Sequence, residues 1–241
     1  MLTNLRNTLA TAFMALVFGF LGAALWSFTG LADNRTREFL LTNPDMLPQM
    51  AEAYQTQQMS EQLAGLGDDI YKPFPGAVIG NPEGSKVLVE FTDYNCGYCE
   101  RSVADVTRLV EQDPELKVVM REWPIFEGSD QPARMALAAA MQGKYRAFHE
   151  AMFELGPSTP ESIEAAARKA GLDLERARED AASEAVTVEL ASNLTFAQSL
   201  GFNGTPGWIT RSTAIPGYVG YDALKEAIDD AGTEAESAEA S

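Results

Sequence analysis

Apolar and polar positions follow the clearest pattern in the middle of the chain. A short, β-branched apolar run at Lys86–Phe91 is typical of a buried strand. A helix with one apolar face is expected after this strand, because apolar residues recur at positions i, i+4, i+7 and i+11: Cys99, Val103, Val106 and Val110. Asp113-Pro114 ends this helix, and a second strand is expected over Leu116–Trp123. The short strand–helix–strand spacing predicts a parallel pair joined by a right-handed crossover.

The second half of the folded domain, which we place at residues 76–231, is mostly helical in pattern. Residues 131–201 are expected to be helical throughout, and the first helix carries an apolar stripe made of Met141, Tyr145, Phe148 and Met152. Gly207–Tyr218 is expected to form a hairpin, and Tyr221 opens a last helix. Residues 232–241, rich in Glu, Ala and Ser, predict a disordered acidic tail.

The N-terminal segment, residues 1–32, has a different character. No charged residue occurs from Asn7 to Ala32, and the apolar stretch Leu9–Leu31 reaches the length of about 20 residues that crosses a bilayer. We favour an uncleaved membrane anchor. The alternative is a secretory signal cleaved near Gly30-Leu31-Ala32. Both interpretations place the rest of the chain outside the cytoplasm.

Residues 33–66 are predicted to form a helical arm, and residues 67–75 a linker rich in Gly, Asp and Pro. Asn43 is expected to cap a helix of this arm, with Pro44 in its first position. The apolar stripes within residues 34–66 need a partner surface. The arm is therefore expected to join copies of the chain into a homo-oligomer. The alternatives are that it packs against its own domain or that it only spaces this domain from the membrane.

The chain has two cysteines, Cys96 and Cys99, at the point where the first strand turns into the helix. Free backbone N–H groups and the helix dipole at that point favour a thiolate at Cys96. A thiolate attacks disulfides, so Cys96 is the candidate nucleophile and Cys99 the candidate resolving thiol.

Two weaker interpretations compete with redox chemistry. A zinc site needs about four ligands, and the chain offers one histidine, His149, which is better read as a packing residue than as a proton shuttle. A purely structural disulfide between Cys96 and Cys99 would close almost no loop. The net charge of −17 without a basic cluster also argues against nucleic acid and anionic lipid surfaces as partners.

Several separated segments resemble the DsbA-like branch of the thioredoxin fold. They are the strand leading into Cys-Gly-Tyr-Cys, the later Gly204-Thr205-Pro206, and the runs Val78–Pro82 and Arg37–Pro44. Within that branch the chain is similar to the copper-sensitivity-suppressor and outer-membrane-antigen types of bacterial disulfide oxidoreductase or isomerase. The resemblance covers roughly Arg37 to Ala231. It implies an α/β thioredoxin fold with an inserted helical domain.

The resemblance also implies roles for five residues beside the two cysteines. Pro206 would have a cis peptide bond and face the thiol pair, and the Thr205 backbone would pair with an extended substrate segment. Glu90 interrupts a buried strand and would accept a proton as the second thiol attacks, unless it points outward to solvent. Gly97 and Tyr98, between the cysteines, would tune the pair and contact substrate.

The implied activity is thiol–disulfide exchange on unfolded or misoxidised proteins at the periplasmic side of the bacterial inner membrane, without a metal or other cofactor. A membrane redox partner would set the direction: kept oxidised, the protein is an oxidase, and kept reduced, an isomerase. Thr205 and the arm favour the isomerase. Two alternatives on the same fold are Cu(I) binding by the cysteines and a redox-inactive chaperone that uses the groove at Pro206.

Overall fold

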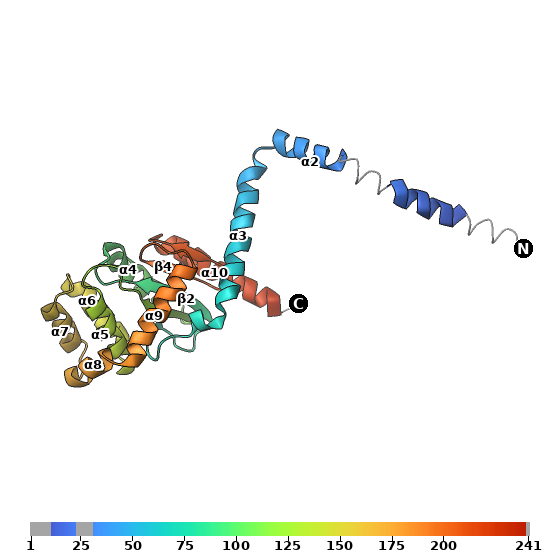
Figure 1. The fold of residues 1–241 in the computed structure, drawn as a ribbon. Helices are drawn as coiled ribbons and strands as arrows, with labels where there is room; N and C mark the ends of the chain where they lie inside the picture. Colours follow the sequence, from blue (N-terminus) through green and yellow to red (C-terminus); the bar gives the residue numbers. More distant parts are fainter. Residues whose placement is uncertain (1–10, 23–30, 240–241) are drawn as a thin grey trace, which may run out of the picture. The chain divides into compact units, whose positions relative to one another are not determined.

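The structure, a computed structural model, describes residues 11–22 and 31–239. The chain divides into two units, residues 1–55 and 56–241. Figure 1 shows the strands and the helices α4 to α10 packed together in the second unit. In the first unit residues 11–22 are helical and helix α2 spans Leu31–Thr42. Helix α3, Met46–Leu66, begins in the first unit and ends in the second.

The membrane anchor or signal predicted for residues 1–32 lies only partly in the described part of the chain. Residues 1–10 and 23–30 fall outside it. Among the helices of residues 11–22 and 31–239, none has both the length and the apolar character needed to cross a bilayer. The anchor therefore stays a prediction.

The expected helical arm is present, but the prediction that Asn43 caps its second helix is wrong. The Asn43 side chain donates to the Phe39 carbonyl at 2.8 Å, at the C-terminal end of α2, and α3 begins at Met46. The Asn43 side chain thus adds to the bonds that the Phe39 carbonyl already accepts from the Asn43 backbone N–H and the Thr42 hydroxyl, both at 3.0 Å. Near the other end of α3, Leu63 is buried in the core of the second unit, so this part of the arm packs against its own domain.

In the second unit, a mixed sheet has five strands among the described residues, in the order β1-β3-β2-β4-β5. Their bounds are Val78–Gly80, Lys86–Thr92, Leu116–Glu122, Gly207–Ile209 and Ala214–Pro216 for β1 to β5. β2 and β3 are parallel and β4 and β5 antiparallel, which confirms the predicted crossover and hairpin. β1 was not predicted as a strand. It pairs antiparallel with β3.

Alternate residues of β2 face two different layers of the core. Leu88 packs in the layer that holds Cys99 and Val106 of α4, the helix Gly97–Gln112. Val89 and Phe91 pack on the opposite face, with Leu63 from α3. This alternation, which follows from the period of two along a strand, points Glu90 into the same layer as Leu88 and α4.

The region predicted to be helical at 131–201 contains five helices, grouped beside the sheet in Figure 1. They are α5 (Asp130–Met141), α6 (Tyr145–Leu155), α7 (Pro160–Lys169), α8 (Leu174–Ala181) and α9 (Glu184–Ser199). The stripe from Met141 to Met152, predicted to lie on one helix, is split between α5 and α6. Gly143 lies between them with a φ of 68°, which side chains other than glycine rarely adopt.

The segments at the two ends of the folded domain also differ from the prediction. The segment 67–75, predicted as a linker, contains a short 3₁₀ helix, η1 (Asp68–Tyr71), in which Ile70 and Tyr71 are buried. The last helix, α10, runs from Tyr221 to Glu239, so the disordered tail predicted from residue 232 is wrong as far as Glu239. Alanine and glutamate are among the strongest helix formers, and the composition that suggested disorder equally supports helix.

Candidate active site around Cys96 and Cys99

The two cysteines lie where β2 turns into α4, as predicted. Cys96 is the N-cap residue of α4, with extended backbone angles, and its carbonyl accepts the first helical hydrogen bond from Glu100. Both cysteines are free thiols; Cys99 is fully buried, and Cys96 keeps 6% of its surface exposed. Of the pair, only Cys96 can be reached from solvent.

The surroundings of the pair shift the pKa values of the two thiols in opposite directions. A hydrogen bond from the Cys99 side chain, together with backbone N–H groups of Tyr98 and Cys99, outweighs burial and lowers the pKa of Cys96 to about 5. Burial and the neighbouring Cys96 sulfur instead raise the pKa of Cys99 far above its ordinary value. At neutral pH the site therefore holds a Cys96 thiolate beside a Cys99 thiol.

Alkylation with iodoacetamide should show this separation directly. The rate of modification at Cys96 should rise with pH through a midpoint near 5 and stay level above it, because the thiolate is the reactive species. Cys99 should remain unmodified in the folded protein because it is buried and protonated. Mass spectrometry of the modified peptide checks this. A midpoint near the ordinary thiol value of about 8.5 would contradict it.

Thr205 and Pro206 lie next to Cys96, and the peptide bond between them is cis, as predicted. In its thiol form the Cys96 sulfur donates to the Thr205 carbonyl at 3.1 Å. The Thr205 hydroxyl is buried and has no hydrogen bond within the described residues, so its proton is available to a thiolate. Gly207 allows this loop to lie close to Phe202, since a Cβ at Gly207 would come within 2.7 Å of that ring.

Glu90 is buried in β2, which excludes the alternative in which it faces solvent. Its carboxylate oxygen lies 2.9 Å from the Ser102 hydroxyl, which also lies 2.7 Å from the Cys99 carbonyl. A serine hydroxyl has one proton and the carbonyl can only accept it, so a protonated Glu90 completes both bonds. Burial agrees with this, because it raises the pKa of Glu90 to about 8.

Gly97 and Tyr98 lie on the open side of the pair. The Tyr98 ring is 55% exposed and stacks on Tyr218, with 6.0 Å between ring centroids. Tyr218 is held by a 2.8 Å hydrogen bond to Asp105. A shallow hollow of about 580 Å³ lies beside them, lined by Gly97, Tyr98, Glu100 and Arg101. The Tyr98 ring is thus exposed to solvent next to the thiol pair.

Sequence reasoning missed the groups that hold the turn before Cys96. The Asp93 carboxylate accepts hydrogen bonds from the backbone N–H groups of Asn95, Ile125 and Phe126 and from the Ser129 hydroxyl. Tyr94 donates to Glu122 at 3.0 Å and lies 3.1 Å from His149. Glu122 interrupts a buried strand as Glu90 does, and that signal could have identified it.

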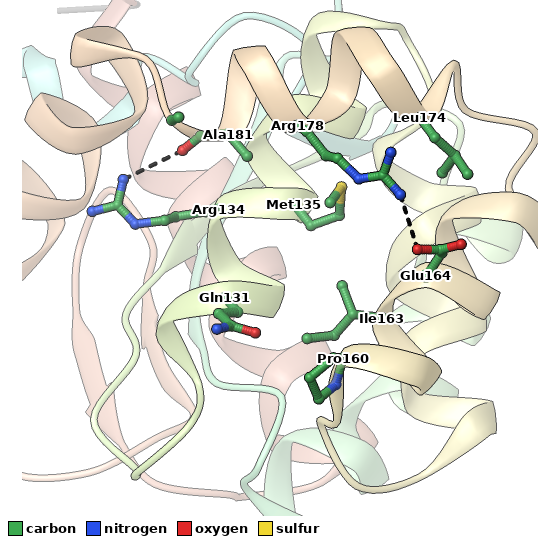
Figure 2. A pocket seen from close by; sticks show the side chains of 10 residues that line it. Gln131, Arg134, Met135, Pro160, Ile163, Glu164, Leu174, Arg178 and Ala181 are labelled. Atoms are coloured by element: carbon green, nitrogen blue, oxygen red, sulfur yellow. Dashed lines mark hydrogen bonds and ion pairs between the residues drawn. The ribbon is translucent and has the colours of Figure 1, made fainter.

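A second hollow, of about 530 Å³, lies within the helical insertion between α5, α7 and α8 (Figure 2). Met135, Ile163 and Leu174 form part of its lining. Of the arginines at its edge, Arg178 is paired with Glu164 at 2.9 Å. None of its lining residues belongs to the thiol site.

Comparison with known proteins places the chain in a family. The model of the DSBA-like thioredoxin domain matches residues 87–229, more than half of the chain. The chain belongs to this family. A thioredoxin-like oxidoreductase from Silicibacter pomeroyi DSS-3 is 43% identical with a TM-score of 0.66, over 69% of this chain and 98% of that one. The catalytic domain of Proteus mirabilis ScsC is 26% identical with a TM-score of 0.64, over 72% and 98%.

Curated relatives match over a smaller share of their own length. The Na(+)/H(+) antiporter NhaA 1 of Salinispora arenicola (strain CNS-205) is 27% identical over 158 residues, covering 64% of this chain and 24% of that protein. The NhaA of Herminiimonas arsenicoxydans is 29% identical over 148 residues, covering 60% and 24%. This chain thus spans about a quarter of their length, and the similarity concerns that part alone.

The family and its structural neighbours support thiol–disulfide exchange as the general activity of an oxidoreductase. A thiol-disulfide exchange protein, alpha-DsbA2 from Wolbachia pipientis, shares the fold with a TM-score of 0.67 at 23% identity.

Proposed function

We propose that this chain exchanges disulfides with protein substrates outside the cytoplasm, with Cys96 as nucleophile and Cys99 as resolving thiol. The observation that carries this proposal is the asymmetric pair: a low-pKa Cys96 at the N-terminus of α4, with 6% of its surface exposed, beside a fully buried Cys99. Such a pair supplies a nucleophile and a protected second thiol one helical turn away.

The exchange begins when the Cys96 thiolate attacks a substrate disulfide. A bond forms between Cys96 Sγ and one substrate sulfur, and the other substrate sulfur leaves as a thiolate. Cys99 then loses its proton and attacks Cys96 Sγ, which releases the second substrate thiol and leaves an intramolecular disulfide. Glu90 takes up the Cys99 proton in its ionised form, which a pKa near 8 leaves in part of the molecules at neutral pH, and Ser102 links it to the Cys99 backbone.

Unfolded or misoxidised proteins are the proposed substrates. An extended segment would lie along the Thr205 backbone and over the exposed Tyr98 ring, with its sulfur at Cys96. The chain would act on the periplasmic side of the inner membrane, held there by the segment 1–32. A periplasmic thioredoxin-like protein from Salmonella enterica serovar Typhimurium, 28% identical with a TM-score of 0.58, supports this location.

We favour isomerase over oxidase as the direction of the exchange, with a membrane redox partner that keeps the cysteines reduced. The test uses two substrates: a reduced protein with several native disulfides, and the same protein with scrambled disulfides. The reduced form of this chain should restore activity to the scrambled substrate. Rapid oxidation of the reduced substrate by the disulfide form, without any reshuffling activity, would contradict the isomerase and support the oxidase.

A further inference from the structure

A buried cluster of polar side chains lies behind the turn that carries Cys96, and the exchange reaction described above does not use it. We call it the Glu122 cluster: Tyr94 from the turn, Glu122 from the end of β3, and Tyr145 and His149 from α6. Each of these side chains is at least nine-tenths buried, and Glu122 is fully so. Buried polar groups of this kind reduce the free energy of unfolding unless they are hydrogen-bonded. Their hydrogen-bond partners therefore indicate what role they have.

The hydrogen bonds of the cluster have a defined direction. The Tyr94 and Tyr145 hydroxyls both donate to Glu122 Oε1, at 3.0 and 2.6 Å. Tyr94 has one proton, and when that proton goes to Glu122, His149 Nδ1, 3.1 Å away, donates to the Tyr94 oxygen. In this arrangement His149 is a neutral imidazole with its proton on Nδ1. Its burial agrees, because it lowers the pKa of His149 to about 3.

The Glu122 carboxyl is neutral at neutral pH. Its second oxygen, Oε2, has no hydrogen bond within the described residues, and a buried carboxylate with one unpaired oxygen would be strongly disfavoured. Burial raises the pKa of Glu122 to about 8, although the two tyrosine hydroxyls oppose the shift. The groups that face it are Asp93 and Tyr94 from the turn, Glu90 from β2, Tyr145 and His149 from α6, and Asn193 from α9, which donates to its backbone carbonyl.

Tyr94 connects this cluster to the nucleophile. It lies two residues before Cys96, in a turn closed by a 3.1 Å hydrogen bond from the Cys96 amide to the Asp93 carbonyl. Its ring also contacts Phe148 and Phe153 of α6, with centroid distances of 6.0 and 5.0 Å. The turn is thus attached to the helical insertion through the Tyr94 ring and hydroxyl.

Glu122 also shares a face of the sheet with Glu90. Thr92 is opposite Glu122 in the parallel pair of β2 and β3, and Glu90 is opposite Met120. Paired positions point the same way, and positions two apart share a face, so both carboxyls enter the layer that holds Cys99. Because this layer is buried, a charge on Glu122 would be little screened there.

We propose that Glu122 is a positioning residue of the thiol site: when neutral it holds the Cys96 turn against the helical insertion through Tyr94, and when charged it disfavours the Cys96 thiolate. This inference rests on the proposed exchange function and adds a pH-dependent control to the same site. It requires no new bond and no further reactant.

Two matched tyrosine variants test the positioning role. Tyr94→Phe and Tyr145→Phe each remove one donor from the same Glu122 oxygen, but only Tyr94 belongs to the Cys96 turn. The pKa of Cys96, followed by the ultraviolet absorbance of its thiolate, should rise in Tyr94→Phe and stay unchanged in Tyr145→Phe. Equal values in both variants and in the wild type would overturn this role.

The charge role is tested by the equilibrium with glutathione in Glu122→Gln, which keeps the shape of a neutral Glu122. At about pH 6 the variant and the wild type should have equal equilibrium constants, because Glu122 is then protonated. At about pH 9 the wild type carries the charge, so its reduced thiolate form should be disfavoured several-fold relative to the variant. Glu150→Gln, a matched change at an exposed position of α6, should follow the wild type at both pH values.

The outcomes separate this inference from the function on which it rests. If the wild type shows no exchange with glutathione at all, the proposed function fails. If the wild type exchanges but Glu122→Gln follows it at every pH, the charge role of Glu122 is overturned while the function stands. Should Glu122→Gln fail to fold by circular dichroism, Tyr145→Phe is compared with the wild type instead, because it removes a donor that stabilises the Glu122 anion. The loss of the reduced thiolate form with rising pH should then begin at a higher pH in Tyr145→Phe than in the wild type. An unshifted profile overturns the charge role.

Discussion

Replacing Cys96 by serine should abolish disulfide exchange, with a loss of more than about 1000-fold. Cys96 is the one thiol of the pair with a thiolate at neutral pH and with an exposed edge. Serine preserves the N-cap position of α4 and is itself a favoured cap, so the fold should be retained. Measured with a fluorescent mixed-disulfide substrate, the variant should show only the rate of the uncatalysed reaction.

The matched variant Cys99→Ser should fail in a different way. It keeps the attacking thiolate but lacks the resolving thiol, so it should accumulate covalent mixed disulfides with substrate that survive a non-reducing gel. Substantial exchange by Cys96→Ser, or trapped complexes formed by Cys96→Ser instead of Cys99→Ser, would contradict the assignment of the two roles.

Replacing Arg121 by methionine should cost about 3–5 kcal/mol of unfolding free energy. The Arg121 side chain is 2% exposed and donates to Glu189 at 2.7 Å and to Asn193 at 3.1 Å. It also donates to three carbonyls of residues 69–72, at 2.7 to 3.0 Å. It thereby ties η1 to α9, and methionine would leave the largely buried Glu189 carboxylate and these carbonyls without their donor.

Urea unfolding monitored by circular dichroism measures this loss. Arg168→Met is the matched control, because Arg168 pairs with Glu164 at the surface, where such a pair contributes about 0–1 kcal/mol. A loss below about 1 kcal/mol for Arg121→Met would contradict the view that the Arg121 hydrogen bonds hold residues 69–72 to the domain.

The parts of the fold that could be predicted from the sequence are those with a local pattern. The strand, helix and strand of residues 86–123 are each specified by their own apolar spacing, and their parallel pairing follows from the short connection. The break at Gly143 was missed because α5 and α6 bury their apolar sides in one core, so the stripe continues across it. β1, with three residues, is too short for a periodic signal.

The same distinction applies to the candidate site. Cys96, Cys99 and Pro206 belong to short motifs, and Glu90 is a charge in an otherwise apolar strand, so each has a local signal. The Glu122 cluster joins three separate segments of the chain, and no local pattern shows that Tyr94 will meet His149. Arg121 was missed for the same reason, since its carbonyl partners lie in a segment predicted to be a linker.

The most direct test of the central claim is the equilibrium redox state of Cys96 and Cys99 across a series of glutathione buffers. The account predicts one two-electron transition between dithiol and disulfide, with a potential between those of a reductant at about −270 mV and a strong oxidant at about −120 mV. An intermediate value fits the proposed isomerase. If the two cysteines form no disulfide with each other in any buffer, the assignment of this pair as a redox-active site is wrong.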